Sequence, residues 1–228
     1  MKKAVLLILF FANGFKGFGQ EIHTVGVFRS FPTGKFGSSN LGSGGFAKSG
    51  WGFLLENNTK PKIFPRGFSF ATRFSYQKNE IDTPRMASKF SQALGHKTRI
   101  SDSAYEPITL LAGPNLEIAL RERLFLQLKF GAGVMFTKVN AFRIEVFDGQ
   151  GNVLFEDVLD ATGNVPFAYL GGVQLRQAIT KKFSVNIFAD YTSAKGKMGA
   201  KLGKVRTTPS EFDMATLNTG LSLKFEFN

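Results

Sequence analysis

The chain has 228 residues, of which 43% are hydrophobic and 20% charged, and its formal net charge is +12. This length supports one domain with a sizeable core and excludes two large ones. There is no cysteine and only two histidines, His23 and His96, so disulfides, zinc ribbons, cysteine nucleophiles and a lipid-modified N-terminal cysteine are excluded, and a histidine-built metal site is disfavoured.

Residues 1–19 have the three parts of a secretory signal peptide. Lys2 and Lys3 form a charged start, residues 4–12 are nine consecutive apolar residues, and the segment ends in the small-x-small site Gly17-Phe18-Gly19. We predict cleavage after Gly19, which leaves residues 20–228 as a single mature domain. The alternative is a short membrane anchor, which the apolar run is too short to form, because a hydrocarbon core is about 30 Å thick.

From residue 21 onward the apolar residues recur with a period of two, which is typical of half-buried strands. The alternation predicts eight strands, at residues 22–32, 45–57, 66–78, 107–120, 123–138, 165–179, 182–194 and 212–227. Pro114 lies inside the fourth of them and cannot donate a hydrogen bond to a neighbouring strand. We therefore expect a bulge or kink at this proline.

The connections between these strands alternate between long and short. The long ones are residues 33–44, 79–106, 139–164 and 195–211, and the short ones are residues 58–65, 121–122 and 180–181. Short turns at one rim and long loops at the other are typical of outer-membrane barrels. The sequence thus predicts an all-β fold, an eight-stranded antiparallel up-and-down transmembrane β-barrel with short periplasmic turns and long extracellular loops.

A soluble lipocalin-like barrel would also show alternating strands, so the direction of the apolar face has to be decided. Glycines gather on the polar face of the strands, where a narrow eight-stranded interior needs small residues. The charged residues of the strands also lie on this face, and the central apolar face has none. We expect a lumen charge network of Lys48, Glu56, Arg73, Glu117, Lys129, Arg176, Asp190, Lys224 and Glu226. A charge on a lipid-facing surface costs about 2–4 kcal/mol at the membrane midplane, so the apolar face is predicted to face lipid.

Aromatic residues on the apolar face predict two girdles at the membrane interfaces. Tyr76, Phe136, Phe167 and Tyr191 are expected near the long-loop rim, and Phe53, Phe68, Phe183 and Phe225 near the short-turn rim. On the opposite face, Phe125, Leu111, Leu170 and Phe188 are expected to point into the lumen. We interpret the lumen as filled by these side chains and by ion pairs. A narrow water or ion path is the alternative.

The C-terminal run Gly-Leu-Ser-Leu-Lys-Phe-Glu-Phe-Asn at residues 220–228, together with the strand and loop pattern, resembles the small outer-membrane barrel superfamily. This group includes the OmpA transmembrane domain, OmpX and PorT-like outer membrane protein beta-barrel domains. Residues 25–28 (VGVF) and 31–37 (FPTGKFG) are similar to the first strand and first loop of the PorT-like group. The resemblance implies insertion by the barrel assembly machinery and, for PorT-like proteins, an accessory role in a secretion system.

Two of the predicted loops carry charge of opposite sign. The last one contains Lys195, Lys197, Lys201, Lys204 and Arg206, which form either a solvated loop or a contact with lipopolysaccharide phosphates. The third is acidic and predicts a hairpin that joins residues 143–147 to residues 153–156 through Asp148-Gly149-Gln150-Gly151-Asn152. A calcium loop is the alternative there, but the EF-hand spacing is absent. The edge of such a hairpin could accept a strand from a protein partner.

Enzyme motifs are weak in this sequence. His96 is followed by Ser101, Asp102 and Ser103, residue types that often gather in loops by chance. We therefore predict no enzymatic activity, no cofactor and no nucleic-acid partner. The predicted function is that of an exported outer-membrane protein with a filled lumen and a structural, adhesive or assembly role through its external loops. Alternatives are a narrow porin-like channel and a PorT-like component of a secretion system.

Overall fold

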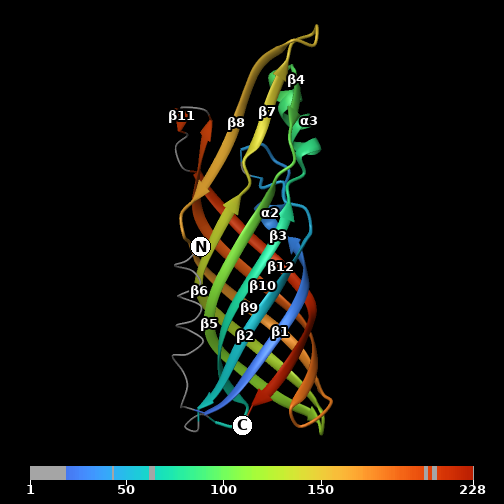
Figure 1. The fold of residues 1–228 in the computed structure, drawn as a ribbon, viewed down its shortest axis with the longest axis vertical. Coiled ribbons are helices and arrows are strands. Elements are labelled where there is room, and N and C mark those ends of the chain that lie inside the picture. The colour runs from blue at the N-terminus through green and yellow to red at the C-terminus, as the bar shows by residue number, and fades with distance from the viewer. Residues whose placement is uncertain (1–18, 43, 62–64, 203–204, 207–209, 228) are drawn as a thin grey trace.

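The computed structural model describes residues 19–42, 44–61, 65–202, 205–206 and 210–227, so the predicted signal peptide, apart from Gly19, lies outside the described residues. Eight antiparallel strands form a closed ring, in which the last strand pairs with the first. In ring order they are β1 (Gly19–Pro32), β2 (Gly50–Pro61), β3 (Phe68–Glu80), β5 (Ala104–Arg121), β6 (Leu124–Val139), β9 (Phe167–Ala178), β10 (Phe183–Leu202) and β12 (Ser210–Phe227). Figure 1 shows them tilted around a common axis. The predicted eight-stranded antiparallel barrel is confirmed.

Two details of the strands differ from the sequence prediction. β2 begins at Gly50 and not at residue 45, because Phe46 has a left-handed backbone (φ 52°) and Ala47 instead bridges Ile81 outside the barrel. Pro114 causes no register shift: Ala112 pairs with Ala132 and Asn115 with Lys129 in one continuous register. The register of β5 against β6 shifts between Ala119 and Arg121, close to the short turn. The missing N–H of the proline is thus accommodated without an inserted residue.

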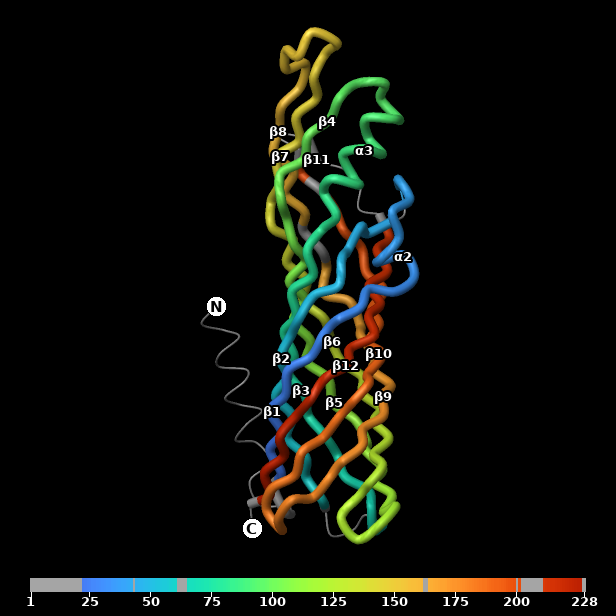
Figure 2. Tube along the Cα trace, turned by 90° about the vertical axis from the view of Figure 1, so that its right-hand side faces the viewer, coloured from blue at the N-terminus to red at the C-terminus, as the bar shows by residue number. Residues whose placement is uncertain are grey.

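The second and third long loops fold together into a lobe beyond the barrel, formed by residues 82–103 and 141–163. It contains α3 (Thr83–Leu94), β4 (Lys97–Ile100), β7 (Phe142–Phe147) and β8 (Val153–Gly163), with the three strands in the order β8-β7-β4. Figures 1 and 2 show this lobe standing above the long-loop end of the barrel. The predicted hairpin of the third loop, β7 with β8, is confirmed. The remaining elements are α2 (Gly34–Gly37) and β11 (Val205–Arg206).

Local sequence accounts for α3. The side chain of Asp82 accepts a hydrogen bond from the backbone N–H of Arg85 at 3.4 Å, a proline lies in the first turn, and Gly95 ends the helix with φ 69°. These are ordinary start and stop signals of a helix. Met86, Ala87 and Phe90 form one face and pack against the buried apolar cluster of the lobe and barrel mouth. Among the described residues, no helix is long and apolar enough to cross a membrane.

The exposure pattern of the barrel is the inverse of that of a soluble protein. On the outer face Ile187 is 60% exposed and Leu221 is 54% exposed, whereas inside Lys129 is 2% and Arg73 is 7% exposed. Burying charge while exposing large apolar side chains is favourable only if the outer medium is apolar. The arrangement therefore matches a barrel surrounded by hydrocarbon.

Glycines on the inner face make room for bulky lumen side chains. A Cβ on Gly52 would overlap the ring of Phe28, and one on Gly172 would overlap the carboxylate of Asp190. Both positions therefore require glycine for close approach, as expected for a narrow eight-stranded interior.

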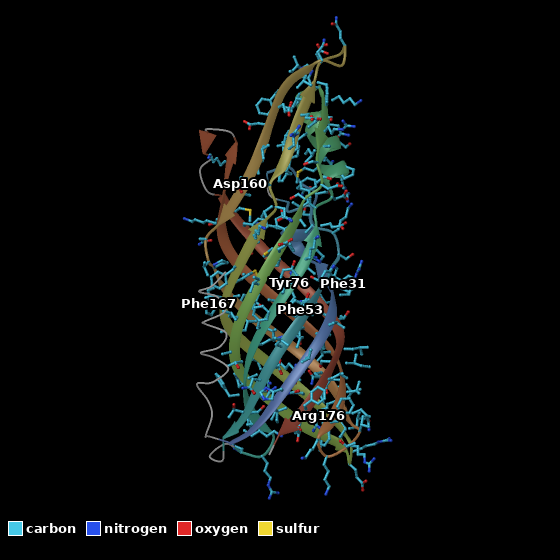
Figure 3. The ribbon with its side chains drawn as sticks, viewed as in Figure 1. Phe31, Phe53, Tyr76, Asp160, Phe167 and Arg176 are labelled. Carbon is cyan, nitrogen blue, oxygen red and sulfur yellow. The ribbon has the colours of Figure 1, made fainter. Side chains whose placement is uncertain are left out.

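Aromatic side chains lie on the barrel wall near both ends. Figure 3 shows Phe31, Phe53, Tyr76 and Phe167 at one level, close to the long-loop end. Phe53 was predicted at the short-turn rim, and this was wrong: it pairs with Tyr76, and their ring centroids lie 5.6 Å apart. The late start of β2 explains the error: because β2 begins at Gly50, Phe53 is its fourth residue and lies near the long-loop end. At the other end Phe183 and Phe225 pair, with ring centroids 5.4 Å apart.

Candidate functional site: the lumen and the outer lobe

A first cluster of buried charges lies in the lumen. Arg73 of β3 pairs with Asp190 of β10, with 2.6 Å between Nη1 and Oδ2, and also lies 3.9 Å from Glu56 of β2. Lys129 of β6 reaches Glu56 at 3.3 Å. The side chains of Arg73 and Lys129 also lie over the ring of Phe188. The four charged side chains come from four different strands, so the curvature of the sheet brings them together.

A second cluster lies nearer the short-turn end, where Figure 3 labels Arg176. Arg176 of β9 donates two hydrogen bonds to Glu117 of β5, at 3.0 and 2.9 Å. Lys224 of β12 lies 3.5 Å from both Glu117 and Glu226. The Arg176 guanidinium stacks on Phe125, 3.8 Å from the ring centroid. This planar, bidentate arrangement suits arginine better than lysine.

The structure brings eight of the nine predicted lumen charges together and leaves Lys48 outside. Its side chain is 45% exposed and pairs with Asp82 at 3.6 Å, above the barrel mouth. The prediction for Lys48 was therefore wrong, because the left-handed Phe46 interrupts the alternation from which it was drawn. The remaining set has four cations and four carboxylates, and each cluster is neutral by itself. Neutral pairing is what burial of charge requires.

Amide and hydroxyl groups occupy the space around these clusters. Gln174 donates to Gln127 at 3.0 Å, Asn115 to Asn58 at 2.6 Å, and Asn186 to Ser222 at 2.9 Å. A cavity of about 20 Å³ borders Glu56, Arg73 and Lys129. A cavity of this size has room for about one water molecule.

An apolar layer covers the charges on the long-loop side. Leu111, Met135, Leu170 and Met214 are all buried inside the barrel. Above them Phe36 of α2 is fully buried, with its ring 5.0 Å from Tyr105 and 5.9 Å from Phe212. The inward placement expected for Phe125, Leu111, Leu170 and Phe188 agrees with the structure. The burial of Phe36 above this apolar layer had no signal in the sequence, because it depends on contacts between distant segments.

The two edges of the lobe sheet differ. The edge of β4 is covered by α3, since the N–H of Thr98 donates to the hydroxyl of Ser91 at 2.8 Å. β8 pairs with β7 from Val153 to Leu159, but on its other side it pairs with β10 only from Leu159 to Gly163. Within the described residues, residues 153–158 therefore have one edge without a strand partner. Val153, Leu154, Phe155 and Val158 are 40–56% exposed along this edge.

The lysines of the last long connection extend β10 and lie opposite acidic residues. Lys195 pairs in register with Asp213, Lys197 with Glu211, and Lys201 with Asp160. Lys204 lies outside the described residues, and for Arg206 on β11 only the backbone is described. Neighbouring carboxylates offset much of the positive field expected from this segment. Its contact with lipopolysaccharide remains a prediction.

The residues considered for catalysis have structural partners. Ser101 accepts a hydrogen bond from the N–H of Arg143 at 2.9 Å, Asp102 accepts one from the hydroxyl of Thr83 at 3.3 Å, and Ser103 donates to the carbonyl of Asn140 at 2.5 Å. His96 is exposed, and no hydrogen bond among the described residues joins its side chain to these three. Residues 101–103 therefore form a connection that is held by hydrogen bonds to neighbouring segments.

Asp148 organises the tip of the lobe hairpin. Its carboxylate accepts hydrogen bonds from the side chain and backbone of Asn152, at 2.9 and 2.8 Å, and from the N–H of Gln150 at 2.8 Å. These bonds, chiefly that from the Asn152 side chain, lower the pKa of Asp148 below its ordinary value. The tip is thus stabilised above the ordinary carboxyl pKa and loses this stabilisation as the pH falls through the lowered value.

We expect the amide NMR signals of Gln150 and Asn152 to titrate together with a midpoint below the pKa of an unstructured aspartate. The variant Asp148→Ala removes the acceptor and should abolish the titration while leaving the barrel signals unchanged. A midpoint at or above the ordinary aspartate value would contradict the described hydrogen bonds.

Comparison with known proteins places this geometry among solved barrels. The sequence matches no protein-family model and no curated protein. The outer membrane protein OprG from Pseudomonas aeruginosa has a TM-score of 0.51 at 13% identity, covering 91% of this chain and 96% of that one. The outer membrane protein AlkL (TM-score 0.47, 16% identity, 92% and 90% covered) and E. coli outer membrane protein W (0.44, 14%, 92% and 100%) are also similar. The chain therefore has the fold of the small eight-stranded outer-membrane β-barrels.

Proposed function

We propose that this chain is an integral outer-membrane protein with a non-conducting barrel, and that it acts by presenting its outer lobe to another protein. The observation that carries the proposal is the edge of β8 at residues 153–158, which has no strand partner among the described residues and lies beside exposed apolar side chains in the lobe. Edges of this kind are usually covered or paired, and an exposed one is a binding site for an added strand. The covered edge of β4 on the same sheet supports this interpretation.

The closed lumen supports a role outside the barrel. The barrel axis passes through two neutral ion clusters, then an apolar layer, then the buried side chain of Phe36. We expect no stable single-channel conductance for the purified protein in planar bilayers. A reproducible conductance would instead support the narrow-channel alternative.

The lobe proposal is tested on detergent extracts of the native cells. We expect the chain to migrate as part of a larger complex under mild extraction, and Leu154→Ser/Val158→Ser to release it, because these side chains flank the open edge. The control Val165→Ser changes an apolar residue that is 50% exposed but lies outside this edge, and should leave the complex intact. If the wild-type protein always migrates as a free barrel, the lobe proposal is rejected.

The composition of the complex separates the remaining roles. Components of a secretion machine would favour the PorT-like accessory role, and a surface ligand would favour adhesion. We assign no catalytic activity or cofactor to the chain, and unaltered lipid A acylation in a deletion strain would agree with this. Insertion by the barrel assembly machinery is part of the proposal.

A further inference from the structure

Strand β8 carries three acids, Glu156, Asp157 and Asp160, and no lysine or arginine. Asp160 lies in the part of the strand that pairs with β10, and its cross-strand neighbour there is Lys201. Glu156 pairs with Arg143 of β7 at 2.9 Å. Asp157 lies where β10 no longer covers the edge, and none of the ion pairs among the described residues includes it. It is therefore the acid of β8 for which the described residues supply no cation.

The backbone N–H of Val158 points toward the open edge of β8. Successive N–H groups of a strand alternate between its two edges, and that of Asn164 donates to the carbonyl of Lys197 on β10 at 3.0 Å. Val158 lies an even number of positions from Asn164, so its N–H faces the same side, beyond the last residue that β10 pairs with. The carboxylate of Asp157 accepts a hydrogen bond from this N–H at 2.7 Å. The Asp157 side chain thus takes the place that a carbonyl oxygen of an added strand would take.

An added strand would continue the line of β10. The last residue of β10, Leu202, pairs with Leu159 of β8 and also with Val205 of β11. Because two strands pair with one residue from opposite sides, β11 lies on the edge of β10 that is away from β8. Within the described residues, the edge at residues 153–158 is therefore open to a segment that runs in the direction of β10, antiparallel to β8.

We propose that this edge binds an extended segment of a partner protein that carries a lysine or arginine opposite Asp157. When a carbonyl of the partner accepts the N–H of Val158, Asp157 loses that hydrogen bond and is covered by the new strand, so its charge requires a counterion. The neighbours Asp160 and Lys201 show such a match further along the same edge. Phe155 and Val158 are exposed, so apolar residues are expected opposite them. The inference rests on the proposed function of the lobe and names the chemistry of its partner.

A second copy of this chain is a poorer occupant of the edge. Since β8 has no cation, pairing of two β8 strands would bring acids together without compensating charge. A charged side chain that bends over an edge also disfavours addition of strands that offer it no counterion. The position of Asp157 therefore makes this edge selective for a cationic segment.

Two synthetic hexapeptides test the proposal on the purified full-length mature protein in detergent micelles. The cationic peptide, Val-Lys-Thr-Val-Val-Thr, places its lysine opposite Asp157 when its first residue lies opposite Val158, and the acidic peptide has glutamate in place of lysine. NMR titration, followed at the amide signals of Glu156 and Val158, should show about tenfold tighter binding of the cationic peptide. A spin label at the N-terminus of this peptide should broaden the signal of Val158 more than that of Val153, because the two strands are antiparallel.

Three variants isolate the charge of Asp157. Asp157→Asn keeps an acceptor for the N–H of Val158 and should reduce the preference for the cationic peptide to less than about twofold. Asp157→Lys should invert the preference. The matched control Asp213→Asn removes a carboxylate of β12 that pairs with Lys35, away from this edge, and should keep the preference at about tenfold. Heat-modifiable gel mobility verifies that each variant is folded.

Equal binding of the two peptides to the wild-type protein, or no binding of either, would overturn the proposal, as would a preference that survives in folded Asp157→Asn. Signals of Glu156 and Val158 that shift with protein concentration alone would show a second copy on the edge and would also reject it. Failure of the lobe function has a separate signature, because the native complex would then be absent whatever the peptide preference. A native complex that Leu154→Ser/Val158→Ser releases, together with equal peptide binding, would reject the cationic segment alone.

Discussion

Replacing Arg73 with alanine is expected to lower the free energy of unfolding by about 3–5 kcal/mol. Asp190, which is fully buried and pairs with Arg73 at 2.6 Å, would be left without its counterion in the middle of the barrel. Glu56 would retain Lys129 alone, at 3.3 Å. Urea-induced unfolding from lipid vesicles, followed by tryptophan fluorescence of Trp51, measures the loss.

Two further variants separate the cost of an unpaired charge from that of any substitution. Arg143→Ala breaks an ion pair of 2.9 Å with Glu156 whose side chains are 55% and 47% exposed, and should cost less than about 1 kcal/mol. Arg73→Met combined with Asp190→Leu removes both buried charges and should recover much of the stability lost by Arg73→Ala. If Arg73→Ala is no more destabilising than Arg143→Ala, the lumen charges are not paired as described.

Ile187→Lys and Leu154→Lys should differ strongly in cost although the two native side chains have similar exposure. Ile187 is 60% exposed on the barrel wall, and Leu154 is 56% exposed on the lobe. A lysine at the membrane midplane costs about 2–4 kcal/mol, whereas an exposed substitution in water stays within about 0.5 kcal/mol. The same vesicle unfolding measurement compares the two. Equal costs would show that both residues face the same solvent, and the membrane orientation would then be wrong.

The sequence predicts the barrel well because successive residues of each strand face different surroundings. Each strand faces hydrocarbon on one side and a crowded polar lumen on the other, so a period of two appears in all eight strands. The alternation also identifies most of the lumen charges, since Lys129 and Asp190 have no other tolerable place. Errors arise where a single residue leaves the extended conformation, and the left-handed Phe46 accounts for both Lys48 and Phe53.

The lobe and the individual partners are less accessible to sequence reasoning. The signals of α3 were present in Asp82, Pro84 and Gly95, but they lie in a segment treated as a loop. The ion pairs join strands that are not neighbours, such as β3 with β10 and β5 with β9. Their choice of partner depends on the closure of the whole sheet, which no local pattern encodes. The same is true of Phe36, whose burial depends on Tyr105 and Phe212.

The transverse ion pairs have a consequence for biogenesis. Because Arg73–Asp190 and Lys129–Glu56 each join strands from distant parts of the ring, neither pair can form while the nascent sheet is still open. An open sheet with incomplete strand pairing would have to carry eight solvated charges into hydrocarbon, at several kcal/mol for each ion. Closure of the barrel and its insertion into the membrane must therefore be concerted, because the hydrated charges of an incomplete barrel oppose its transfer into hydrocarbon.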